Sequence, residues 1–224
     1  MLIGLSLLIL LSSAAFCLHQ KRREAAWRAG LLDDCTGQVA TPRLGRDRAG
    51  FATLRGRLVP AAVEVRFVPD TLVHRRLPQL WLHVTLQAPL ATEAVLDVLR
   101  RPAGAEFYAP DRLPLRLPVP EAWPADTLVR GTAGAEALLA RIGPALSRLL
   151  ADPTVKEVLV TPNGLRLTVQ ASQGSRGTYL LLRGSRFPLS RLAPDQLGGT
   201  LRDGLDLARI LSEPSLETWH ARAA

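Results

Sequence analysis

The order of apolar and polar residues separates an N-terminal apolar run from a charged stretch and a body of alternating segments. The chain begins "MLIGLSLLILLSSAAFCLHQKRR", and no charged residue occurs from Leu2 to Leu18. A helix of this length is about 25 Å long at roughly 1.5 Å per residue. That length is at the lower end of what crosses a hydrocarbon core of about 30 Å. The pattern predicts a transmembrane helix over residues 1–18, with the bilayer contacted by residues 2–18.

A cleaved leader would have a similar apolar run, and two features argue against it. No basic residue precedes the run, and the best cleavage candidate, Ser13-Ala14-Ala15, lies inside the run instead of after it. A lipid-modified Cys17 is also disfavoured, because Phe16 stands where a small residue is expected. We therefore expect a retained anchor, with cleavage and export as the open alternative.

Basic residues follow the run directly, at Lys21, Arg22, Arg23 and Arg28. Such residues stay on the cytoplasmic side of a span and are attracted to anionic lipid headgroups. This predicts an inner-membrane protein with one span, a cytoplasmic body and a basic neck that touches the headgroups. Residues 19–50 are predicted to be neck and linker, with a short helical extension near Glu24–Leu32, and regular structure is expected to start at Phe51.

The segment 51–101 has the alternation of β-strands. In "AVEVRFV" apolar and charged residues alternate, which is the period of a half-buried strand. A strand at 51–58 is expected to pair with it through a turn at Pro60. In "LWLHVTLQ", Leu82, Val84 and Leu86 share one face, and Trp81, His83 and Thr85 share the other. Residues 95–100 fit either a strand or a short helix.

The second half of the chain combines helices and strands. Six prolines make 102–124 an extended connection. Leucines at helical spacing predict a helix at 133–150 with Thr132 as N-cap. Two alternating runs flank Asn163-Gly164, the signature of a tight hairpin. A third strand is expected at 177–184 and a final helix at 195–211, although Gly198, Gly199 and Gly204 weaken that helix.

The fold class is α+β: a transmembrane helix, antiparallel strands, a proline-rich crossover, a helix, a hairpin plus strand, and a C-terminal helix. The predicted parts are 1–18, 19–50, 51–101, 102–124, 125–211 and a tail at 212–224.

The net charge of +8 is concentrated near the membrane. Residues 21–57 hold nine basic and four acidic side chains, so the rest of the body is only weakly basic. The body also has few aromatic residues on which bases could stack. Nucleic-acid binding is therefore not expected.

Catalytic and metal motifs are not found in the sequence, which has two cysteines and four histidines. No cofactor, metal or catalytic residue is assigned. Asp70 and His74 form a speculative polar site, and a surface turn is the plainer interpretation. Trp81, His83 and Thr85 form a speculative contact surface; the plainer alternative is a sheet that is covered on both faces.

The runs "VRFVPDTLVHRRLPQLWLHVTLQAPL" and "DPTVKEVLVTPNGLRLTV" resemble uncharacterised bacterial proteins of the alphaproteobacterial type. Those proteins too have an N-terminal span followed by a body of unknown function. The resemblance implies a bacterial inner-membrane protein and transfers no functional residue. The leading hypothesis is a membrane-tethered, non-catalytic binding or scaffolding module with an unknown protein partner. A membrane-anchored enzyme with an unrecognised site and an exported periplasmic protein are the alternatives.

Overall fold

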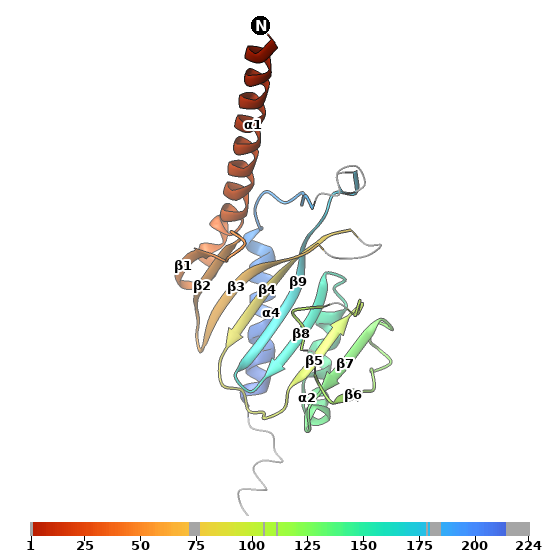
Figure 1. Cartoon of the computed structure of the whole chain (residues 1–224). Coiled ribbons are helices and arrows are strands. Elements are labelled where there is room, and N and C mark those ends of the chain that lie inside the picture. The colour runs from red at the N-terminus through yellow and green to blue at the C-terminus, as the bar shows by residue number, and fades with distance from the viewer. Residues whose placement is uncertain are drawn as a thin grey trace, which may run out of the picture.

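The chain folds into one long helix that projects from a β-rich body (Figure 1). The computed structural model describes residues 2–71, 77–104, 106–110, 112–177, 179 and 185–213, without the side chains of residues 2–9. Helix α1 (Leu2–Gly30) is unbroken from the apolar run into the basic neck. The helix predicted for the apolar run is therefore present, and it continues without a joint toward the body.

Within the described residues, no helix combines the length and the apolar character needed to cross a membrane. The structure thus gives no support to the predicted transmembrane helix as such. Four large apolar side chains on the projecting part of α1 are nevertheless exposed. Leu10, Leu11, Phe16 and Leu18 are 67%, 60%, 63% and 51% exposed.

Residues 19–50 are not the linker that we expected from their composition. After α1 comes a 3-10 turn, η1 (Asp33–Gln38), and then strand β1 (Ala40–Arg46). Leu31, Leu32 and Cys35 at this junction are fully buried. The prediction that regular structure starts at Phe51 is therefore wrong, because α1 joins the sheet through packed residues.

The body is built on one antiparallel sheet, which confirms the α+β class. The described strands follow the order β1-β2-β3-β4-β9-β8-β5-β7-β6. Their bounds are β2 Ala52–Leu58, β3 Ala61–Asp70, β4 Gln79–Gln87, β5 Leu96–Arg100, β6 Leu115–Leu117, β7 Thr127–Gly131, β8 Val155–Thr161 and β9 Gly164–Gln173.

The expected hairpins are confirmed. Strand β2 pairs with β3 across the turn at Pro60, and β8 pairs with β9 across Asn163-Gly164. Gly164 has φ +143, a conformation that side chains with a Cβ rarely adopt. Residues 96–100 form a strand and not a helix. Strand β7 and the short β6 were not predicted, and most of the strand predicted at 177–184 lies outside the described residues.

Two helices cover one face of the sheet. Helix α2 (Ala135–Leu150) contacts β5, and α4 (Pro194–Ser212) runs behind β4 and β9 (Figure 1). A Cβ on Gly204 would overlap the Leu86 side chain and touch Leu167, so this glycine lets α4 approach the sheet closely. The N-cap of α2 is Gly134 and not the predicted Thr132, whose hydroxyl instead accepts a hydrogen bond from the Val95 amide.

Candidate functional site

The opposite face of the sheet carries a buried cluster of polar and charged side chains, named here the charged cluster. Strand pairing sets these residues side by side: His83 lies opposite Thr168, and Thr168 lies opposite Glu157. Its members are His83, Asp97, Lys156, Glu157, Arg166 and Thr168. All except Arg166 are buried. At these positions this face is therefore covered, like the face of the sheet that packs against α2 and α4.

The cover is the proline-rich connection, which returns across the sheet. Arg166 donates to the Tyr108 carbonyl at 2.7 Å, and the Tyr108 ring meets His83 edge-on at 5.2 Å. Lys156 Nζ binds Glu106 Oε1 at 2.8 Å and donates to the carbonyls of Arg100 and Arg101. The ion pair between Lys156 and Glu106 and the hydrogen bond from Arg166 to Tyr108 therefore attach the connection to the sheet.

Two of the three residues proposed as a contact surface are buried, in agreement with the alternative of a sheet that is covered on both faces. Trp81 and His83 are buried, and Thr85 is half-buried. Alternation correctly placed all three on the face opposite Leu82 and Val84. The exposure that we expected for this face is not observed, because a segment distant in sequence covers it.

Burial governs protonation in the charged cluster. Burial, together with the positive charges of Arg166 and Arg66, lowers the pKa of His83 to about 3. Burial raises the pKa of Glu157 although Arg166 pairs with it at 2.9 Å. Burial likewise raises the pKa of Asp97 against the effect of its partner Arg130. His83 is thus neutral at physiological pH, where a strong basic catalyst would need a much higher pKa.

Several polar atoms in the charged cluster and in Tyr108, which covers it, have no hydrogen-bond partner in the described part of the chain. They are Nδ1 and Nε2 of His83, Oδ1 of Asp97 and the Tyr108 hydroxyl. Buried polar groups without partners cost about 1–3 kcal/mol each. Sequence reasoning missed this cluster, although the register from Asn163-Gly164 places Glu157 opposite Thr168.

Of the predicted polar pair, only Asp70 lies within the described residues. Asp70 accepts a hydrogen bond from Trp81 Nε1 at 3.4 Å, and His74 lies outside the described residues. No group of three or more His, Cys, Asp or Glu side chains in the described structure is placed to hold a metal ion.

Three residues of the basic neck are exposed, and the fourth contacts the body. Lys21, Arg22 and Arg23 are exposed on α1. Arg28 instead pairs with Glu24, donates to the Ala49 carbonyl at 2.9 Å and lies over the Phe51 ring. Arg28 therefore holds α1 to the body, and three of the four predicted neck residues are left to face the surroundings.

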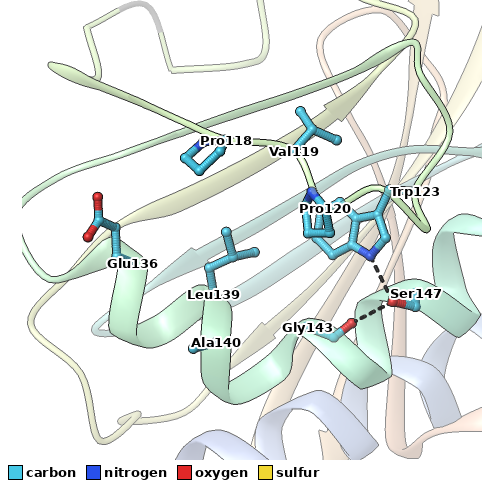
Figure 2. Close-up of a pocket in the computed structure, with 9 residues that line it drawn as sticks. All are labelled: Pro118, Val119, Pro120, Trp123, Glu136, Leu139, Ala140, Gly143 and Ser147. Atoms are coloured by element: carbon cyan, nitrogen blue, oxygen red, sulfur yellow. Dashed lines mark hydrogen bonds between the residues drawn. The ribbon is translucent and has the colours of Figure 1, made fainter.

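An apolar groove of about 490 Å³ lies between the proline-rich connection and α2 (Figure 2). Pro118, Val119 and Pro120 form one wall, and Leu139 and Ala140 of α2 form the other. The Trp123 indole closes one end because its N–H donates to Ser147 Oγ at 2.7 Å. The surface left to a ligand there is chiefly apolar.

Comparisons with known proteins add little. No protein-family model matches the chain, and no curated protein matches it. One solved structure is similar, the "crystal structure of the mycobacterial trehalose monomycolate transport factor A, TtfA". The TM-score is 0.36 at 11% identity, over 71% of this chain and 68% of that chain. A likeness this weak supports no conclusion about function, and the resemblance to alphaproteobacterial proteins stays a prediction.

Proposed function

We propose that this protein is a membrane-tethered, non-catalytic binding or scaffolding module of the bacterial inner membrane. The observation that carries the proposal is the exposed apolar surface of a helix that projects away from the body (Figure 1). Leu10, Leu11 and Phe16 lie on this surface, and in the sequence the uncharged run extends from them back to Leu2. Transfer of each such side chain from water into hydrocarbon is favourable by about 1.5–3 kcal/mol.

The exposed neck residues support the orientation. Lys21, Arg22 and Arg23 follow the apolar run within two turns of the same helix. Positive side chains at this place favour the cytoplasmic side and bind anionic headgroups at about 1 kcal/mol each. Because α1 is continuous with the body, the membrane would hold the body in a defined position and not on a flexible tether.

The charged cluster favours a structural role over an enzymatic one. Shifted pKa values in one place are a mark of active sites. Here, however, the side chains of His83 and Glu157 are fully buried beneath Tyr108, and the charges are used to hold the proline-rich connection. A substrate would have to displace that connection to reach them.

Membrane fractionation tests the proposal. Membranes from cells that produce the full chain are washed with high salt and then with alkaline carbonate. We expect the full chain to stay with the membrane and a double variant, Leu11→Arg with Phe16→Arg, to be released. Val59→Arg changes an apolar residue of the body that is even more exposed, at 87%, and serves as the control that should remain bound. Recovery of the unaltered chain in the soluble fraction would overturn the proposal.

A further inference from the structure

A second pocket lies where α1 meets the segment that leads into α4. It has a volume of about 820 Å³. Gln20, Arg23 and Trp27 line it from α1, and Arg186, Phe187 and Leu189 line it from the segment. It is named here the collar pocket. It begins within one helical turn of Leu18, the end of the apolar run, so it lies at the membrane-proximal side of the body.

The floor of the collar pocket is aromatic and fixed. Trp27 stacks on Phe187 with centroids 6.4 Å apart and meets Phe51 edge-on at 6.0 Å. The indole N–H of Trp27 donates to the Leu189 carbonyl. Since that polar group is already used, Trp27 offers a ligand only its apolar ring.

The rim of the pocket carries uncompensated positive charge. Arg23 and Arg186 are exposed, and neither side chain forms an ion pair or hydrogen bond with another described residue. Glu24 also lines the pocket, but Arg28 neutralises it. Gln20, Arg23 and Trp27 are spaced by three and four positions, so the helix presents them on one side.

We propose that the collar pocket binds the headgroup of an anionic phospholipid, with its phosphate between Arg23 and Arg186. Guanidinium groups bind phosphate oxygens in pairs, which gives them an advantage over a diffuse positive surface. The aromatic floor fits the glycerol and first methylene groups of the same lipid. This inference rests on the proposed membrane attachment, because only that places the pocket at the headgroup level.

Short-chain lipids test the inference without a bilayer. The full chain in an uncharged detergent is titrated with dihexanoyl-phosphatidylglycerol, dihexanoyl-phosphatidylcholine and inorganic phosphate, and tryptophan fluorescence reports binding. Phosphatidylcholine offers the same phosphate, but its quaternary ammonium group brings a positive charge close to Arg23 and Arg186, which repel it. We expect phosphatidylglycerol to bind at least about tenfold more tightly than phosphatidylcholine.

Variants separate the pocket from general electrostatics. Arg186→Gln and Arg23→Gln should each weaken phosphatidylglycerol binding by at least about tenfold. Arg22→Gln removes the same charge from the neighbouring position, which does not line the pocket, and should change the affinity by less than about twofold. Arg186→Lys keeps the charge without the paired donors, and its affinity for phosphatidylglycerol should lie between those of Arg22→Gln and Arg186→Gln.

Equal weakening by Arg22→Gln and Arg186→Gln would overturn the pocket assignment in favour of a diffuse basic surface. Inorganic phosphate that binds as tightly as phosphatidylglycerol would overturn the lipid assignment. Near-ultraviolet circular dichroism confirms that each variant keeps its aromatic packing. Fractionation remains independent: lipid binding in micelles by a chain that is not found in membranes would refute the proposed function alone.

Discussion

Replacement of His83 by leucine should remove a specific part of the acid sensitivity of the fold. In the native structure the imidazole is fully buried, faces Tyr108 and lies near Arg166 and Arg66, so its pKa falls from 6.5 to about 3. The unfolded chain regains the ordinary pKa of 6.5. Between these two values the unfolded state binds one more proton than the folded state. The free energy of unfolding therefore rises with pH across this window and falls as the pH is lowered from 6.5 toward 3.

The size of the effect follows from the width of the window. Each pH unit within it corresponds to about 1.4 kcal/mol. Acidification from about pH 7.5 to about pH 4.5 should therefore lower the free energy of unfolding of the native chain by about 2.5–3 kcal/mol through His83. His83→Leu lacks this contribution, and the remaining carboxyl groups titrate in both proteins and largely cancel in the difference.

Urea unfolding followed by tryptophan fluorescence measures the effect at both pH values. The quantity of interest is the loss of unfolding free energy on acidification, compared between the native chain and His83→Leu. His19→Leu, which alters an exposed histidine on α1, should lose as much as the native chain. If His83→Leu loses as much stability as the native chain, the imidazole is not held neutral by burial and the account of the cluster fails.

Three further changes test the packing. Lys156→Met removes the counter-ion of the buried Glu106 carboxylate, which then keeps the backbone amides of Ala103 and Gly104 as donors. Unfolding in urea should show a loss of about 3–5 kcal/mol. Adding Glu106→Gln should recover part of this loss, and an unchanged loss would contradict the pairing. Gly164→Ala forces a side chain into a φ of +143, and thermal unfolding should show a loss of at least about 1–3 kcal/mol; an unchanged midpoint would contradict the hairpin geometry. Ser147→Ala leaves the Trp123 indole N–H without its acceptor, and the same assay should show a loss of about 1–3 kcal/mol, whereas no loss would show that the indole finds another partner.

Local patterns predicted much of the sheet and little of what covers it. Asn163-Gly164 and the flanking alternation identified the β8–β9 hairpin, because the turn and the faces of its strands are properties of neighbouring residues. Strand β1 escaped prediction since it is an edge strand whose residues are all exposed, so burial imposes no alternation on it. The glycines of α4 were interpreted as weakness, whereas Gly204 gives the helix its close contact with the sheet.

The charged cluster shows where sequence reasoning ends. Strand alternation places His83 on the face opposite Leu82, and an outward histidine is the ordinary expectation there. Its burial depends on Tyr108, which comes 25 positions later in the chain and crosses the sheet within an irregular segment. No periodicity in that segment predicts which strands it covers. The basic neck was partly predictable, but the ion pair that occupies Arg28 requires the packed end of α1.

Topology and the mass of the mature chain test the membrane tether most directly. Two C-terminal fusions are compared, one to a reporter active only in the cytoplasm and one to a reporter active only in the periplasm, and the mass of the unfused chain is measured from isolated membranes. The account predicts cytoplasmic activity together with the full-length mass in the membrane fraction. Periplasmic activity, or a chain shortened at its N-terminus and free of the membrane, would contradict it.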